Sequence, residues 1–249
     1  MESMIERAIE LNFERICFTD HMDYDFPKQY THNFEFDPES YFQTLNLMKE
    51  QYQDKIKVLF GVECGMQPHL ADRFQALITS YPFDFVICSS HIVNGQDPYY
   101  KEFWEGMTKK EGISLYLDSI LDNINAFDNF DVYGHLDYIV RYVPDHNCTY
   151  RYEDYKDKID LILSTLIAKG KGIEVNTAGY KYGLGTTNPK EDLIKRYFEL
   201  GGKILTIGSD GHKPEHFAYD FEKACQMLKS IGVRQYTVFE NRKPIFIDL

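Results

Sequence analysis

The stretch K-V-L-F-G-V-E at residues 57–63 is an apolar run of strand length that ends in a carboxylate. A polar turn follows it, and then residues 68–80, whose apolar positions recur with helical spacing. Runs of the same strand type are predicted at 15–19, 83–89, 132–134, 172–175 and 203–208. Helical patterns are predicted at 4–11, 38–52, two stretches ending near 127, 152–169, 189–200 and 214–231. A last pair of short strands is predicted at 235–239 and 244–247.

The order of these elements predicts an α/β fold. Six strand-then-helix units in series favour a parallel sheet with crossover helices. A chain of 249 residues is long enough for one such domain with a single large core. A closed α/β barrel has about eight units, so this series falls short of one, and its first predicted element is a helix with no strand before it.

Composition and charge exclude several classes of function. The chain holds 27 Lys plus Arg against 39 Asp plus Glu, so its net charge at pH 7 is −12. Surfaces that bind nucleic acid are normally basic, so we expect no nucleic-acid partner. No apolar stretch approaches the roughly 18 to 20 residues that cross a bilayer, and the N-terminus lacks the apolar core of a signal peptide. We therefore expect a cytoplasmic protein with no membrane partner, and the sequence predicts no particular oligomeric state.

Imidazoles and carboxylates stand at the ends of the predicted strands. In parallel α/β folds these ends meet at one rim, where ligands bind. The residues there are Thr19-Asp20-His21, Glu63, Ser90-His91, His135-Leu136-Asp137, Glu174 with Asn176, and Ser209-Asp210-Gly211-His212. One such residue alone is more often a cap or a loop residue. Four of the eight histidines share this rim, however, which predicts a metal cluster, and imidazole together with carboxylate suits Zn, Mn or Fe.

These motifs resemble those of the PHP (polymerase and histidinol phosphatase) superfamily. The ordered set is T-D-H at 19–21, G-V-E at 61–63, S-S-H at 89–91, G-H-L-D at 134–137, E-V-N-T-A-G at 174–179 and G-S-D-G-H at 208–212. The chain most resembles the histidinol-phosphatase branch, through I-E-R-A-I-E-L at 5–11, V-N-T-A-G at 175–179 and F-E-N-R-K-P-I at 239–245. The resemblance covers essentially the whole chain.

The resemblance implies a distorted (β/α)7 barrel with a trinuclear metal centre. Carried over position by position, Glu63 looks like the carboxylate that bridges two metals and Asp210 like a ligand of the first. His91 and His135 resemble the imidazoles of the second metal, and His21 and His212 resemble ligands of the third. We therefore expect two to three divalent ions of Zn, Mn or Fe.

The family's first motif, an H-x-H on a strand before the first helix, has no counterpart in residues 1–249. We therefore expect a single PHP-type domain that is N-terminally incomplete here, as a barrel lacking its first strand. The hypothesis is that the start codon used here lies downstream of the true start codon, and that about 15 to 25 residues of the native gene product are absent.

The activity that the resemblance implies is histidinol-phosphatase: hydrolysis of L-histidinol phosphate to L-histidinol and phosphate in histidine biosynthesis. Arg141 and Lys181 follow strand ends and either bind the phosphate, with Asn176 nearby, or are solvated loop cations. Asp20 and Asp137 either orient ligand imidazoles or protonate the leaving group.

The loops after the strands offer candidates for the rest of the substrate. Acidic side chains in the loop after His21 could hold the substrate cation, and aromatic rings at the rim could stack on its imidazole. These candidates are the acids Asp23, Asp25 and Glu35 and the aromatics Tyr24, Phe26, Tyr99 and Tyr100. Two alternatives remain: another PHP-type phosphoesterase acting on a small phosphate ester or nucleotide, and a degenerate, non-catalytic metal-binding protein.

Overall fold

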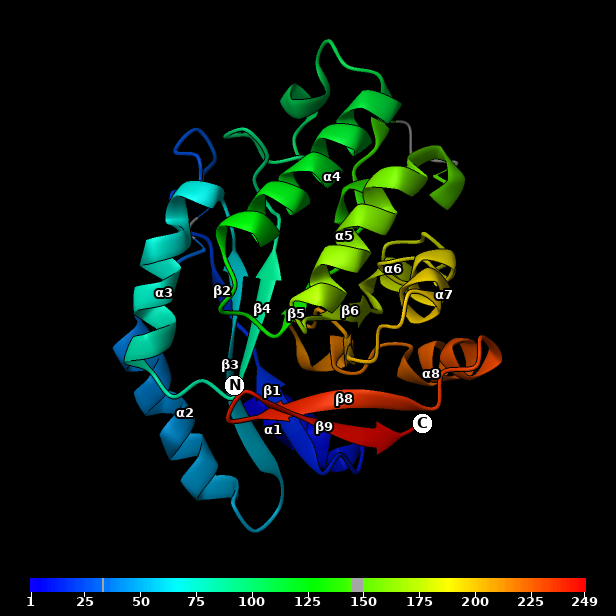
Figure 1. Cartoon of the computed structure of the whole chain (residues 1–249). Helices are drawn as coiled ribbons and strands as arrows, with labels where there is room; N and C mark the ends of the chain where they lie inside the picture. Colours follow the sequence, from blue (N-terminus) through cyan, green and yellow to red (C-terminus); the bar gives the residue numbers. More distant parts are fainter. Residues whose placement is uncertain (33, 145–149) are drawn as a thin grey trace.

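A curled, mostly parallel sheet forms the centre of the computed structural model, which describes residues 1–32, 34–144 and 150–249 (Figure 1). The strands of the sheet, in spatial order, are β1 (Arg15–Phe18), β3 (Lys57–Gly65), β4 (Phe85–Ser89), β5 (Val132–Tyr133), β6 (Gly172–Asn176) and β7 (Leu205–Gly208). A short strand, β2 (His21–Met22), continues the direction of β1 and pairs in parallel with the end of β3. The predicted α/β fold is thereby confirmed, with every neighbouring pair in the sheet parallel.

Most helices lie where the helical spacing predicts them, and a short helix over Ala178–Lys181 is an addition to the prediction. The helices are α1 (Glu2–Glu10), α2 (Pro38–Tyr52), α3 (Ala71–Ser80), α4 (Lys109–Ala126), α5 (Lys156–Ala168), α6 (Ala178–Lys181), α7 (Glu191–Glu199) and α8 (Phe221–Ser230). Short 3-10 helices occupy Pro68–Leu70, Lys101–Trp104, Tyr138–Arg141, Tyr152–Tyr155 and Pro214–His216. The start of α2 is encoded locally, because the Asp37 side chain accepts a hydrogen bond from the Ser40 amide and Pro38 occupies the first turn.

One predicted helix, 214–231, is broken in the structure. A 3-10 turn ends at His216 and α8 begins at Phe221. Between them Ala218 and Asp220 adopt positive φ angles of 53° and 52°, which no α-helix tolerates. The spacing of apolar residues runs across this break, so periodicity alone predicts one helix instead of two elements.

The helices cover the outer face of the sheet and bury its apolar strands. In Figure 1, α2 and α3 lie on one side of the curl, and α4 and α5 lie beside each other over β4 to β6. Eight of the nine residues of β3 are buried, which is typical of a parallel strand covered on both faces. Large core side chains such as Phe60, Phe74 and Tyr116 are almost fully buried, each contributing about 1.5–3 kcal/mol to folding.

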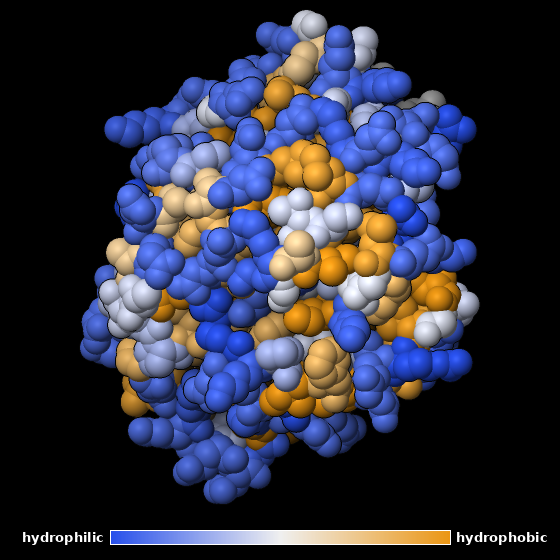
Figure 2. Space-filling model, viewed as in Figure 1, coloured by the Kyte–Doolittle hydropathy of each residue, from blue (hydrophilic) through white to orange (hydrophobic). Residues whose placement is uncertain are grey.

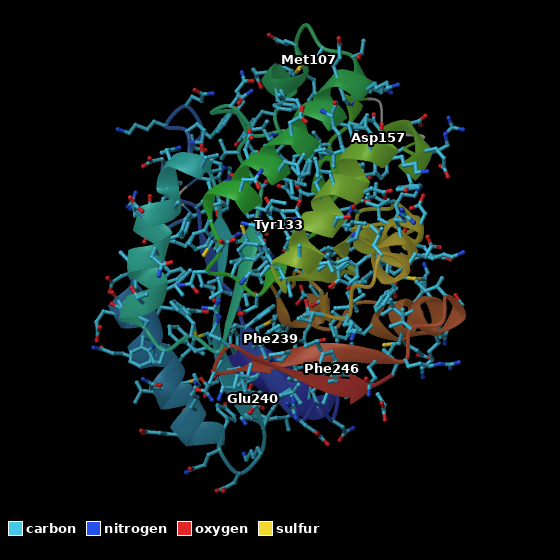
Figure 3. All side chains as sticks on the ribbon, in the orientation of Figure 1. Met107, Tyr133, Asp157, Phe239, Glu240 and Phe246 are labelled. Atoms are coloured by element: carbon cyan, nitrogen blue, oxygen red, sulfur yellow. The ribbon has the colours of Figure 1, made fainter. Side chains whose placement is uncertain are left out.

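A C-terminal hairpin of β8 (Gln235–Glu240) and β9 (Lys243–Asp248) packs against the lower end of the sheet (Figure 1). Phe239 and Glu240, labelled in Figure 3, lie on β8 where it passes β1. The Glu240 carboxylate is 3.1 Å from the Arg15 guanidinium and 2.5 Å from the Lys57 ammonium. At the turn, the Arg242 Nε atom donates to Asp131 at 2.6 Å. Ion pairs and hydrogen bonds therefore hold the hairpin against residues at the starts of β1 and β3 and just before β5.

The sheet does not close on itself, because β1 and β7 form its two edges. A cavity of about 620 Å³ lies between them and is lined by residues of both strands and of β8. At its upper end this cavity reaches His21, Glu63 and Asp210. No helix in the described ranges combines the length and the apolarity that crossing a membrane requires. The face shown in Figure 2 is mostly hydrophilic, with hydrophobic side chains gathered toward its centre and right.

Candidate metal centre

The carboxyl ends of the strands bring the predicted ligands together at one rim. Their donor atoms form three overlapping groups, each with all atoms within 4.8 Å of one another. The groups are Glu63 with His91 and His135, His21 with Asp210 and His212, and His21 with Asp23 and His91. All six residues predicted as ligands therefore belong to at least one group, and Asp23 joins them.

Glu63 lies near the end of β3, the strand between β1 and β4, and touches several of the imidazoles. Its Oε1 atom is 3.0 Å from His135 Nε2 and 3.3 Å from His91 Nε2, and its Oε2 atom is 3.4 Å from His21 Nδ1. The Ser89 hydroxyl donates to Oε1 at 2.7 Å. Burial by itself raises the pKa of Glu63, yet the surrounding imidazoles hold it well below its usual range. The carboxylate is therefore ionised and presents both oxygens to the group.

Asp23 fixes the orientation of His91. Its Oδ2 atom lies 2.8 Å from His91 Nδ1, and both side chains are buried. This contact leaves His91 Nε2 directed toward Glu63. Burial lowers the pKa of His91, but the Asp23 and Glu63 carboxylates outweigh it and raise the pKa well above the ordinary value. A carboxylate on the far nitrogen of an imidazole is the usual support of a metal-binding histidine.

The donor set fits divalent transition ions. His21 Nδ1, His135 Nδ1 and Asp23 Oδ1 are buried without a hydrogen-bond partner in the part of the chain that the structure describes. Buried polar atoms are normally paired. Unpaired nitrogen and oxygen atoms among the residues of the three groups, here called the ligand cluster, therefore indicate a missing partner of positive charge. Imidazole nitrogens with carboxylate oxygens suit Zn, Mn or Fe better than Mg or Ca.

Arg141 stands beside this cluster, held by three side chains. It is buried, and its guanidinium donates to Asn188 Oδ1 at 2.8 Å, to Asp210 Oδ2 at 2.9 Å and to Asn176 Oδ1 at 3.1 Å. Lys181 lies at the same edge and donates to the Asp210 carbonyl at 3.1 Å. Arg141 is therefore not a solvated loop cation, whereas Lys181 is partly buried and its role stays a prediction. Arg141, with Asp210 and all four histidine ligands, lines a second cavity of about 360 Å³.

Comparison with known proteins places this geometry in a family. The model of the PHP domain family matches residues 1–178. The chain belongs to the PHP domain family. Curated relatives include histidinol-phosphatase from Lactococcus lactis, which is 32% identical over 96% of this chain and 88% of its own. A probable histidinol-phosphatase from Clostridium acetobutylicum is also 32% identical, over 98% of this chain and 90% of its own.

Solved structures agree with this placement in the PHP domain family. Histidinol phosphate phosphatase from Lactococcus lactis, complexed with zinc, L-histidinol and phosphate, superimposes with a TM-score of 0.90 at 31% identity. That match covers 98% of this chain and 92% of the other. A structure from Listeria monocytogenes has a TM-score of 0.75 at 20% identity, over 90% of this chain and 93% of the other, and shows the same fold.

The orienting role predicted for Asp20 and Asp137 at this PHP-domain centre is not seen in the structure. Among the described residues, neither carboxylate accepts a hydrogen bond from a ligand imidazole, and protonation of the leaving group by either residue stays a prediction. Asp20 is exposed and its amide donates to the Tyr41 hydroxyl. Asp137 is buried and accepts hydrogen bonds from the Asn188 side chain at 2.6 Å and the Lys190 amide at 3.0 Å. A strand-end position predicts the rim but not which way a side chain turns, and Asp137 turns toward the 186–190 loop.

Of the three acids predicted in the loop after His21, Asp23 lines the second cavity and the other two do not. Asp25 and Glu35 point to Arg73, at 3.3 and 3.5 Å, and not into the second cavity. Tyr24 is buried against Phe74 and the Arg73 guanidinium instead of facing the rim. The other predicted aromatics, Phe26, Tyr99 and Tyr100, do line the second cavity.

Two residues of the site have roles that the sequence does not predict. Glu174, on β6, is predicted at the rim but not as a support of a ligand, and it accepts a hydrogen bond from the His135 amide at 3.0 Å. Burial and the Glu63 carboxylate raise the pKa of Glu174 to about 8. Asn188 links Asp137 to Arg141, and its role depends on contacts about fifty residues away in sequence. Its only local signal is the Asn-Pro pair, which is typical of a turn.

Proposed function

We propose that this protein is a metal-dependent phosphomonoesterase that hydrolyses L-histidinol phosphate to L-histidinol and phosphate, a step of histidine biosynthesis in the cytoplasm. The proposal rests on one observation: residues of the ligand cluster and the buried Arg141 guanidinium line the same cavity. Metal ligands beside a fixed arginine are what a phosphate ester requires. The Lactococcus lactis relative, complexed with zinc, L-histidinol and phosphate, supports this substrate.

The ligand cluster holds two to three divalent ions of Zn, Mn or Fe in this proposal. Glu63 with His91 and His135 forms one site, His21 with Asp210 and His212 another, and His21 with Asp23 and His91 a third arrangement that shares their ligands. Bound divalent ions supply Lewis acidity toward phosphoryl oxygens and toward water.

Arg141 and Lys181 bind the phosphoryl group. The three hydrogen bonds of Arg141 to Asn188, Asp210 and Asn176 hold its plane fixed, which lowers the entropy lost when an anion binds. Tyr138 and Tyr182 lie against the guanidinium, with ring centroids 5.2 and 5.0 Å from Cζ. Those rings limit access of water to the cation and strengthen its interaction with an anion.

We propose further that the PHP domain contains one more strand, between β1 and β7. Both are edges of the sheet, and the cavity of about 620 Å³ separates them. Edge strands with open backbone groups favour pairing with another strand. Reading the genomic DNA upstream of Met1 tests the proposal: an in-frame segment carrying H-x-H supports it, and a stop codon without such a segment contradicts it.

Phosphate release from L-histidinol phosphate tests the function directly. Chelator-stripped protein is reloaded with Zn, Mn or Fe and assayed against L-histidinol phosphate, glycerol phosphate and a nucleoside monophosphate. We expect turnover of the first and at least about tenfold lower kcat/KM for the others. Hydrolysis of the nucleotide alone would point to another phosphoesterase, and metal binding without turnover of any ester to a non-catalytic protein.

Glu63→Gln provides the matched test of the metal centre. Removing the charge that several imidazoles share should lower kcat by about 100-fold or more. Glu10→Gln is the control, because Glu10 is exposed at the end of α1 and pairs only with Arg7 among the described residues. Equal activity of the two variants would contradict a catalytic role for the cluster.

A further inference from the structure

We propose that Asp97 is the residue that selects a cationic leaving group, by binding the ammonium group of the amino-alcohol part of the substrate. This inference rests on the proposed function and names how the same site chooses its phosphate ester. Asp97 lies in the loop after β4 and was not singled out by any sequence motif. The inference rests on one observation. The Asp97 carboxylate is buried, has no basic residue as a partner among the described residues, and lines the same cavity as the ligand cluster and Arg141.

The cavity of about 360 Å³ is lined by two kinds of side chain. One kind is the metal ligands His21, His91, His135, Asp210 and His212 together with Arg141. The other kind is aromatic, and Asp97 lines the same cavity. The aromatic residues are Phe26, Phe34, Tyr99, Tyr100, Tyr138, Tyr142 and Tyr182, of which Tyr138 and Tyr182 lie against Arg141. A phosphate ester whose phosphoryl group meets the ligands and Arg141 therefore has its alcohol part in the same cavity as Asp97 and the rings.

The charges of this cavity are otherwise paired. Asp210 accepts from Arg141, and Asp23 accepts from His91. Asp97 has no basic partner within ion-pair distance among the residues that the structure describes. Its Oδ1 atom accepts a hydrogen bond from the Tyr99 amide at 2.8 Å, and no described residue donates to Oδ2. Asp97 is therefore the carboxylate of this cavity that is left for a ligand.

Burial makes the unpaired carboxylate costly. Only 8% of the surface of Asp97 is exposed, and burial raises its pKa despite the hydrogen bond from Tyr99. A buried carboxylate is stabilised when a cation replaces the lost water. An ammonium group supplies that cation and donates hydrogen bonds to the open oxygen, whereas a neutral or anionic alcohol leaves the carboxylate unpaired.

The surrounding rings add shape to this charge preference. The stacked pair of Tyr30 and Tyr100, with ring centroids 3.8 Å apart, joins the loop after β2 to the loop after β4. Tyr99 and Tyr142 pack edge to face across the same cavity, at 5.4 Å. Flat aromatic walls suit a planar heterocycle such as imidazole. The cavity thus favours an alcohol that carries both a positive charge and a flat ring.

Asp97→Asn tests the inference, because asparagine keeps the size of the side chain and removes its charge. Metal-loaded protein is assayed with L-histidinol phosphate and with p-nitrophenyl phosphate, whose alcohol part carries no ammonium group. We expect kcat/KM for L-histidinol phosphate to fall about 10- to 100-fold, mostly through KM. The value for p-nitrophenyl phosphate should stay within about twofold, as should the metal content.

A binding measurement makes the result independent of turnover. Calorimetric titration should show weaker binding of L-histidinol to Asp97→Asn by about the same factor, with unchanged binding of inorganic phosphate. Asp25→Asn is the matched control, because this carboxylate lies in the loop after β2 and pairs with Arg73 outside the cavity.

The outcomes separate the two proposals. Three results for Asp97→Asn would overturn the role of Asp97: loss of turnover with both esters, loss of metal, or no change with either ester. Hydrolysis of L-histidinol phosphate by the wild type would still support the proposed function in each case. If the wild type does not hydrolyse L-histidinol phosphate, the proposed function fails. The calorimetric titration then tests Asp97 by itself. If the wild type and Asp97→Asn bind L-histidinol equally well, or if neither binds it, the role of Asp97 is overturned.

Discussion

His91 Nδ1 lies 2.8 Å from Asp23 Oδ2, and the two buried side chains join the loop after β2 to the end of β4. The contact fixes which imidazole nitrogen faces Glu63. It also places a second carboxylate within reach of the ligand cluster, as part of the group formed with His21. Orientation of one ligand therefore depends on a residue that is 68 positions away in sequence.

Asp23→Asn should weaken the centre without unfolding the protein. Asparagine keeps the size of the side chain but loses the charge that raises the pKa of His91. Loss of such a support lowers metal affinity or activity by about 10- to 100-fold. Metal titration of chelator-stripped protein and phosphate release measure the two effects. Asp25→Asn is the comparison, since Asp25 is exposed and pairs with Arg73, and an equal loss in both variants would contradict the orienting role of Asp23.

Asp137→Ala should lower stability as well as activity. The carboxylate of Asp137 accepts from the Asn188 side chain and from the Lys190 amide. Its removal leaves the Lys190 amide without this acceptor and the Asn188 side-chain amide with only the 3.5 Å hydrogen bond to the Asp137 carbonyl. We expect the free energy of unfolding to fall by about 1–3 kcal/mol. Activity should fall too, because Asn188 also accepts from Arg141. Urea denaturation with parallel assays measures both, and reduced activity at unchanged stability would instead favour a direct role of Asp137 in proton transfer.

Much of this site can be predicted from one rule, that the carboxyl ends of parallel strands meet at one rim, and the rest cannot. Glu63, His91 and His135 were predicted because parallel strands end at one rim, and the structure brings their donor atoms together. The rule says nothing about loops. Whether Asp20 or Asp23 reaches an imidazole depends on the backbone on either side of β2, and the broken helix before Phe221 depends on two positive φ angles. Such features arise from tertiary packing, which no local pattern in the sequence records.

Gly208→Ala should displace Glu174. An added Cβ at Gly208 would lie 2.2 Å from Glu174 Oε1, far inside van der Waals contact. We expect a loss of about 1–3 kcal/mol in the free energy of unfolding, as for other overpacked positions. Adding Glu174→Asp shortens the side chain that the methyl group meets. Denaturation of the single and double variants gives the coupling energy, and additive losses would show that the two residues do not compete for this space.

Acid should remove the contribution of the Asp160 and Arg196 ion pair. Hydrogen bonds from Arg196 lower the pKa of Asp160 below its ordinary value. A carboxyl group with a lowered folded pKa stabilises the protein above its unfolded pKa of about 3.9 and loses that effect as pH falls through the folded pKa. The pair is partly exposed, so we expect less than about 1 kcal/mol. Denaturation of wild type and Asp160→Asn should therefore differ at pH 7 and converge near pH 2, and a difference that grows in acid would contradict this.

Removal of metal should destabilise the folded protein, because an ion that binds the folded ligand cluster no longer contributes its binding free energy. Glu63, Asp23 and Asp210 converge at the ligand cluster, and the Nδ1 atoms of His21 and His135 have no hydrogen-bond partner among the described residues. At free metal about 100 times above the dissociation constant, binding adds about 2.7 kcal/mol. For a chain of this size that corresponds to about 5 to 10 °C in Tm. Thermal denaturation with chelator and with added Zn or Mn measures the shift. Glu63→Gln should reduce it strongly, because that variant loses the carboxylate nearest to three imidazoles, and an equal shift in wild type and variant would place the bound ion elsewhere.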